Sequence, residues 1–140
     1  GRRKLPRQRG YCLFQEFVPN NKSDIRIVVV GDHAIGLRRM VPDGDFRASG
    51  SGMIDYDYRK IPIETVQTAF RCAQRLKSQS LAIDFVTTDS GEFLIVEISY
   101  GYSAPAYYSC PGYWDKSLIW HEDGNVRPEY WILENLIGVK

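Results

Sequence analysis

The chain has few of the residues on which disulfide, zinc and histidine chemistry depend. Its cysteines are three in 140 residues, Cys12, Cys72 and Cys110, and no two of them are spaced as Cys-x-x-Cys. An odd number without that spacing indicates neither a disulfide framework nor a zinc site, and it suits a reducing cytoplasm. With only His33 and His121 and no Ser-His-Asp pattern, a histidine-based covalent mechanism is not expected.

Long apolar runs are also absent. No stretch approaches the roughly 20 apolar residues that a membrane span needs, and the opening segment lacks the apolar core of a signal peptide. We therefore expect a cytoplasmic protein without a membrane partner. A length of 140 residues with 44% hydrophobic residues supports one ordinary core, which predicts a single domain.

Charge is uneven at one place only, the N-terminus. The net charge is +1, yet five basic residues lie within the first nine, namely Arg2, Arg3, Lys4, Arg7 and Arg9. Such an arm is either a solvated linker or a contact for nucleic acid. Because the first residue is Gly and not Met, we expect the chain to be cut from a longer protein.

The most informative stretch is 80–99, SLAIDFVTTDSGEFLIVEIS. Two apolar runs flank Thr-Thr-Asp-Ser-Gly, a pattern that predicts a β-hairpin. With Ser90 and Gly91 as a two-residue loop, Asp84 lies directly opposite Glu97, with Cβ atoms roughly 5 Å apart. Two carboxylates at that distance repel each other, so they are either a cation site or a pair of solvated acids.

The other face of this hairpin is apolar and needs a cover. We expect it to consist of Leu81, Ile83, Phe85, Leu94, Val96 and Ile98. Segment 63–77 has apolar residues at helical spacing, and its helix is the natural cover, leaving Asp84 and Glu97 on the open side. The expected fold class is α+β, an antiparallel β-sheet with one face covered by helices.

The remaining segments add strands and loops. We predict a strand at 11–18, a hairpin formed by 24–30 and 34–41, and a terminal helix at 127–137. Arg26 is the only charge in an apolar strand, so it either reaches the sheet rim or faces a site that attracts a cation. The Gly/Ser stretch around Arg47 is either a phosphate-wrapping loop or an ordinary flexible one. The aromatic stretch 100–114 is expected to be an ordered loop, either a stacking platform or packed on its own domain.

Five motifs in order give a family resemblance. They are Gln15 to Val18, then Asp24 to Arg26, then Phe46-Arg47, then Asp84, and last Glu97 to Ser99. In arrangement and spacing the chain resembles, over 11–103, the second, magnesium-binding lobe of the ATP-grasp ligases, closest to the ribosomal-protein glutamyl ligase branch. The fold implied is the C-terminal lobe of an ATP-grasp enzyme.

The resemblance implies cofactors and residue roles. Glu16, Phe17 and Val18 would contact the adenine of ATP, and Asp24 the ribose. Arg26 and Arg47 would stabilise phosphate or an acyl phosphate, and Asp84 and Glu97 would bind Mg²⁺. Magnesium prefers carboxylate and phosphate oxygens, and an arginine fork matches phosphate oxygens, so the chemistry agrees with these roles.

The reaction implied is the joining of a carboxylate, from a small molecule or peptide, to an amine or similar nucleophile through an acyl phosphate. Ser99 stands where the family usually has Asn, and its hydroxyl would be a weaker third magnesium ligand. The family also closes a second lobe over ATP. By resemblance, residues 1–10 are a basic linker from a missing upstream lobe, 11–140 form the C-terminal lobe, and the fragment alone is expected to be inactive.

A second hypothesis belongs to a different class. The basic arm and the tyrosine-rich stretch, including Tyr107, could hold single-stranded nucleic acid by charge and stacking, without catalysis. Paired carboxylates on the open sheet face argue against a polyanion there, so nucleic acid is the less favoured partner.

Overall fold

The computed structural model describes residues 10, 12, 14–42 and 52–138, and it is an α+β fold. Its described strands form one seven-stranded sheet in the order β5-β4-β1-β2-β6-β7, with β3 also paired to β2, and every pairing is antiparallel. The strands are β1 (Ser23–Val30), β2 (His33–Met40), β3 (Ile54–Asp55), β4 (Ser80–Thr87), β5 (Phe93–Ser99), β6 (Gly112–Asp115) and β7 (Trp120–Glu122). The expected fold class is confirmed.

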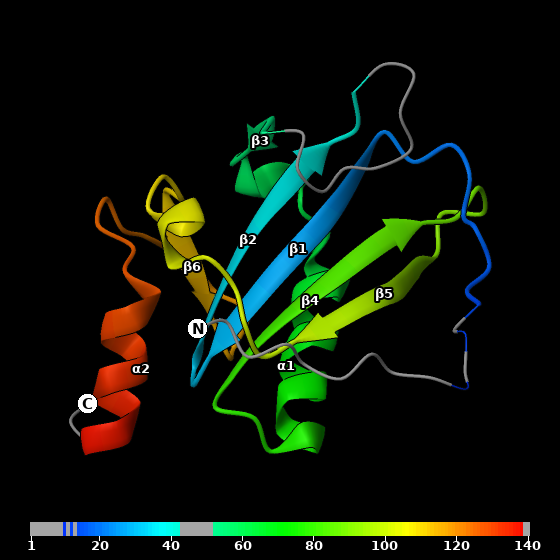
Figure 1. The fold of residues 1–140 in the computed structure, drawn as a ribbon. Coiled ribbons are helices and arrows are strands. Elements are labelled where there is room, and N and C mark those ends of the chain that lie inside the picture. The colour runs from blue at the N-terminus through cyan, green and yellow to red at the C-terminus, as the bar shows by residue number, and fades with distance from the viewer. Residues whose placement is uncertain (1–9, 11, 13, 43–51, 139–140) are drawn as a thin grey trace, which may run out of the picture.

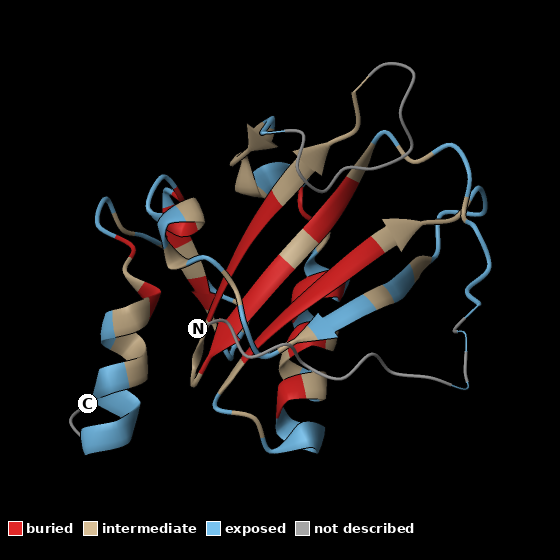
Figure 2. Cartoon of the chain, in the orientation of Figure 1, coloured by how far each residue is buried: buried red, intermediate tan, exposed pale blue. Residues whose placement is uncertain are grey.

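The predicted hairpin at 24–41 is present as β1 and β2. Val30 pairs with His33, which leaves Gly31 and Asp32 as a two-residue turn. Gly31 has a φ of +57°, the conformation that the first central position of a II′ turn requires and that glycine adopts without strain. Both β1 and β2 lie inside the sheet, so their apolar runs are buried on both faces (Figure 2).

Helix α1 (Ile63–Leu76) covers one face of the sheet, as expected for segment 63–77. Its buried side chains Val66, Ala69 and Ala73 pack on one core cluster with alternate residues of the central strands, among them Ile25, Ile27, Val29, Leu81, Ile83 and Phe85. The helix ends at Lys77, which adopts the left-handed conformation that commonly closes a helix.

The opposite face carries a second core cluster over part of its area. Val28, Val30 and Ala82 point to this side and pack with Tyr107, Cys110 and Val126. The cover comes from the short 3₁₀ helix η2 (Ala104–Tyr107) and helix α2 (Pro128–Ile137), whose Trp131 and Ile132 contact the cluster. Helix α2 confirms the predicted terminal helix and lies at the end of the sheet away from β5 (Figure 1).

Two element predictions are wrong. The stretch 100–114 is not a single loop, because its aromatic and small residues form η2 and β6. The described residues of 11–18 are not a strand, because no described strand pairs with them, and Pro19 and Asn20 turn the chain directly into β1. A second 3₁₀ helix, η1 (Tyr58–Lys60), leads into α1. In the described ranges, no helix has the length and apolar character needed to cross a membrane.

Candidate functional site

The β4-β5 hairpin places Asp84 directly opposite Glu97, as the sequence predicts. The predicted two-residue loop is wrong, however. The Thr88 amide donates to the Glu92 carbonyl and the Gly91 amide to the Thr88 carbonyl, both at 2.9 Å, so the loop has three residues and ends at Gly91 with a φ of +85°. A shift of one residue in the pairing next to Asp84 restores the expected register of the two acids.

This shift is a β-bulge, and it changes which β5 side chains share a face. Phe85 pairs with Ile95 while Asp84 pairs with Glu97, so Val96 is the additional residue. Leu94 pairs with Val86 and therefore lies on the face of the acids, whereas the sequence placed it on the apolar face. Leu81, Ile83 and Phe85 are buried under α1 as predicted, but Ile95 and Ile98, which pair with Phe85 and Ile83 on that face, are 38% and 45% exposed. The apolar face of β5 is thus only partly covered.

The Asp84 carboxylate is held by two arginines. Arg26 Nε donates to Oδ1 at 2.5 Å and Arg26 Nη2 to Oδ2 at 2.6 Å, while Arg39 Nη2 donates to Oδ2 at 2.6 Å. Arg39 also makes two bonds to Asp24, the shorter through Nη2 and the other from Nε at 2.8 Å. Four alternating charges thus run across β4, β1 and β2.

This arrangement overturns one prediction and decides between the two alternatives left open for Arg26. Asp84 is 3% exposed, so it does not lie open to solvent as expected; only Glu97 does. Arg26 belongs to an interior strand and does not reach the sheet rim, because its guanidinium faces Asp84. The alternative, in which Arg26 faces a charged site, is the one that the structure contains. Arg39 was not singled out from the sequence. The signal was present, because Arg38 and Arg39 follow apolar residues in β2, just as Arg26 lies among apolar residues in β1.

The pKa shifts follow from these contacts. The hydrogen bonds to Asp84 raise the pKa of Arg26 despite its partial burial. Burial alone would lower the pKa of Arg39, but the hydrogen bond to Asp24 and the charge of Asp84 together raise it. Burial raises the pKa of Tyr107, although the charge of Arg26 opposes the shift. Both arginines are therefore permanently charged, and Tyr107 stays neutral beside them.

Ser99 lies on the same face as Glu97, but its hydroxyl bonds to the backbone of a neighbouring residue, Gly101. Its Oγ donates to the Gly101 carbonyl at 2.9 Å and accepts from the Gly101 amide at 3.2 Å. The hydroxyl that would serve as a third cation ligand therefore stabilises the turn after β5.

These residues suit a magnesium ion only in part. A carboxylate offers roughly four acceptor positions, and three on Asp84 are taken, which leaves one on Oδ1. Glu97 adds an exposed carboxylate directly across the ladder. Among the described residues no group of three or more His, Cys, Asp or Glu side chains could hold an ion. The set therefore fits Mg²⁺ when further oxygens, such as phosphates, complete the shell.

A cavity of about 510 Å³ adjoins this hairpin. Its lining comes from the segment before β1 and from the hairpin, namely Gln15, Glu16, Phe17, Val18, Pro19, Thr88, Asp89, Leu94, Ile95 and Val96. The three residues predicted to contact adenine are thus in one cavity. Leu94 connects it to the acids, because Leu94 and Asp84 share a face of the sheet.

Asn21 fastens this segment to the hairpin, and the sequence did not single it out. Its Nδ2 donates to the Val18 carbonyl at 3.0 Å, and its Oδ1 accepts from the Thr87 amide at 2.8 Å. The structure thus brings Asp24, Arg26, Asp84 and Glu97 to one face, with Glu16 to Val18 beside them. Arg47 lies outside the described residues.

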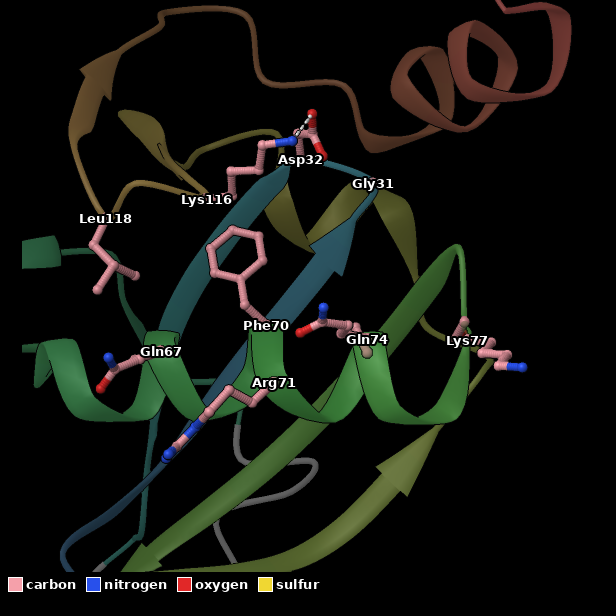
Figure 3. Close-up of a pocket in the computed structure, with 11 residues that line it drawn as sticks. Gly31, Asp32, Gln67, Phe70, Arg71, Gln74, Lys77, Lys116 and Leu118 are labelled. Atoms are coloured by element: carbon pink, nitrogen blue, oxygen red, sulfur yellow. Dashed lines mark hydrogen bonds and ion pairs between the residues drawn. The ribbon is translucent and has the colours of Figure 1, made fainter.

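A second cavity, of about 550 Å³, lies against helix α1 (Figure 3). Phe70 forms part of its wall, and Lys116 pairs with Asp32 at 2.9 Å on its rim. Figure 3 shows Arg71 and Lys77 pointing away from Phe70. Because α1 covers the face opposite Asp84, this cavity is separate from the charged cluster.

Comparisons with known proteins define the class. The model of the RimK-like ATP-grasp domain matches residues 6–104, so the chain belongs to this family of ATP-grasp domains. The chain is similar to a protein named probable alpha-L-glutamate ligase from Nitrosococcus oceani, with 29% identity over 91 residues that cover 64% of this chain and 30% of the relative.

Among solved structures, the chain resembles the macrocyclase MdnB from Microcystis aeruginosa MRC. The identity is 20% and the TM-score 0.48, over 64% of this chain and 31% of the other. The chain thus spans about a third of the length of both proteins. The resemblance to the ATP-grasp ligases stated from the sequence is confirmed at the level of the family.

Proposed function

We propose that this chain is the nucleotide- and magnesium-binding half of an ATP-dependent ligase that joins a carboxylate to an amine or similar nucleophile. Membership of the RimK-like ATP-grasp family supports an ATP-dependent ligase. The observation that carries the assignment to these residues is the shared face of Asp24, Arg26, Asp84 and Glu97 next to the cavity lined by Glu16 to Val18.

The cavity suits the base and sugar of ATP. Its wall combines apolar side chains of the segment before β1 with those of the β4-β5 hairpin, a lining that suits a planar base. Asp24 follows that segment and lies on the face of Asp84, where it would receive the ribose hydroxyls. From there the phosphates would extend toward Arg26 and Glu97.

The charges suit phosphoryl transfer. The charges of the two arginines and two aspartates in the cluster cancel, namely those of Arg26, Arg39, Asp24 and Asp84. Glu97 then gives the site one net negative charge. Asp84 and Glu97 would hold Mg²⁺, which when bound would neutralise the phosphates. Arg26 would stabilise the charge on a transferring phosphoryl group, with Arg47 as its proposed second partner. The activated species we propose is an acyl phosphate, attacked by the amine without a covalent enzyme intermediate.

Calorimetry on the intact protein tests this proposal. Asp84→Asn combined with Glu97→Gln removes both carboxylates, and we expect Mg-ATP affinity to fall by at least tenfold. Asp55→Asn is the matched control, because Asp55 pairs with Arg38 and Lys60 on the same sheet but away from Asp84. Unchanged Mg-ATP binding in the double variant would rule the proposal out.

We also propose that turnover needs a second lobe. The chain spans about a third of its relatives, and residues 1–10 would link it to an upstream lobe that closes over the cavity. The 140-residue chain alone is then expected to consume no ATP, and robust ATP hydrolysis by it would contradict this. The nucleic-acid alternative loses one of its contacts, because Tyr107 is 1% exposed and cannot stack on a base.

A further inference from the structure

The carboxylate of Asp84 is bound by two arginines, and this affects the order in which ligands can bind at the site. This carboxylate accepts three hydrogen bonds from two guanidinium groups and is nearly buried. A cation at the remaining position on Oδ1 would lie beside the Nε of Arg26, which already donates to that oxygen. Like charges at such short range repel strongly in a partly buried site. Asp84 is therefore a poor ligand while Arg26 stays in place.

The two arginines are not equally fixed. Arg39 binds Asp24 through two nitrogens as well as Asp84, so it has two carboxylate partners. Arg26 forms an ion pair only with Asp84 among the described residues, and Tyr107 beside it is neutral. Its side chain is 19% exposed, against 13% for Arg39. The guanidinium of Arg26 can therefore leave Asp84 at a lower cost in free energy than that of Arg39.

We propose that Arg26 makes cation binding at Asp84 depend on the nucleotide. Without nucleotide, Arg26 occupies and neutralises Asp84. When phosphates reach the site, the guanidinium of Arg26 transfers to their oxygens, and Asp84 becomes available to a divalent cation. This inference rests on the proposed function, since it requires a nucleotide at this site.

The exchange is reasonable on charge. A triphosphate offers several oxygens and more negative charge than one carboxylate, and a guanidinium binds phosphate in the same forked geometry. Arg39 keeps Asp84 in position throughout, through its anchor on Asp24. By linkage, any factor by which nucleotide raises the cation affinity is also the factor by which the cation raises nucleotide affinity.

Calorimetry of the intact protein with Mg²⁺ alone, and with ATP in the presence of EDTA, tests the proposal. In Arg26→Gln the affinity for Mg²⁺ alone should rise by about tenfold or more, while the affinity for metal-free ATP should fall. A loss of folding would weaken the binding of Mg²⁺ and of ATP alike. A rise in Mg²⁺ affinity together with a fall in ATP affinity therefore cannot result from unfolding. Arg26→Lys keeps the charge but makes a single-point contact, and it should lie between wild type and Arg26→Gln.

Arg38→Gln is the matched control. Arg38 carries the same charge on the same sheet, but it bonds to Ser23 and Asp55 on the other face, so Mg²⁺ affinity should not change. A second readout is the ¹⁵Nε–¹H resonance of Arg26, which should shift when ATP is added without metal, while that of Arg38 stays in place.

The outcomes separate the inference from the proposed function. If wild-type protein binds Mg-ATP but Arg26→Gln and Arg26→Lys leave the affinity for Mg²⁺ alone at the wild-type value, the inference is overturned. An Arg26 resonance that does not respond to ATP overturns it as well. If wild-type protein fails to bind Mg-ATP, the proposed function fails and the inference with it. If Arg26→Gln does not fold, the Arg26→Lys titration decides.

Discussion

The imidazole of His33 stacks on the indole of Trp131, with ring centroids 4.6 Å apart and 11° between the ring planes. This contact joins the start of β2 to helix α2, and Tyr113 packs edge-on against His33 with ring centroids 4.8 Å apart. The stack fixes α2 near the end of β1 where Val30 pairs with His33, whereas Asp24 pairs with Arg39 toward the other end.

This stack should weaken in acid. Burial lowers the pKa of His33 below its ordinary value of 6.5, although Asp32 and Glu134 oppose the shift. A lowered pKa means that the unfolded chain takes up the proton more readily, so stability is complete above about pH 7 and declines as the pH falls through the unfolded value. Urea unfolding at pH 7.5 and 5.5 should show this loss. The variant His33→Phe keeps an aromatic ring that cannot titrate, so it should lose less stability between pH 7.5 and 5.5 than the wild-type protein does.

Gly112 is required by a close approach to β7. A Cβ on this residue would lie 2.0 Å from the His121 carbonyl oxygen, which is backbone and cannot move aside cheaply. We expect Gly112→Ala to destabilise the protein by about 3 kcal/mol, at the upper end of overpacking costs. Gly124→Ala serves as the control because its Cβ would meet no atom within 4 Å. Equal midpoints of urea denaturation for the two variants would contradict the prediction.

Asn21→Ala should weaken nucleotide binding more than it weakens the fold. The variant loses bonds to Val18 and Thr87, each of the size of about 1 kcal/mol, and so releases the segment that lines the cavity. We expect several-fold weaker ATP binding in calorimetry, while the sheet stays folded by circular dichroism. Asn125→Ala, an exposed change far along the chain, should leave ATP affinity as it is.

Ser99→Asn should strengthen cation binding in the presence of nucleotide. An amide oxygen is a better ligand for Mg²⁺ than a hydroxyl, and this hydroxyl is engaged with Gly101. We expect a several-fold gain in Mg²⁺ affinity at saturating ATP. Ser99→Ala removes the bonds to Gly101 without adding a ligand, so a gain of the same size in both variants would show that releasing the turn, and not the amide, is responsible.

Local patterns predicted much of this fold because they reflect local physics. The apolar spacing of 63–77 predicted α1, the segments 24–30 and 34–41 predicted the β1-β2 hairpin, and the pattern of 80–99 predicted the opposed acids. The pairing of β1 with β4, by contrast, joins residues such as Arg26 and Asp84 that are 58 positions apart. No local pattern reveals such a pairing, so the burial of Asp84 by two arginines was not predictable.

Two local errors also cancelled. The loop of the β4-β5 hairpin is one residue longer than predicted, and the bulge at Val96 shifts the pairing back by one. Segment 11–18 has the composition of a strand, yet no described strand pairs with residue 12 or residues 14–18. The amino-acid composition of a segment indicates which secondary structure it can form, whereas strand pairing also requires a neighbouring strand.

The bulge at Val96 separates the two ends of the β4-β5 hairpin. The pairing has one register from Thr87 to Phe85 and another from Asp84 to Ala82. Because this irregularity absorbs a change of one residue, the position of Glu97 across from Asp84 does not depend strictly on the length of the loop at Asp89. The rim of the cavity can therefore vary in length and sequence while the paired carboxylates keep their alignment, so the two parts of the site can change independently.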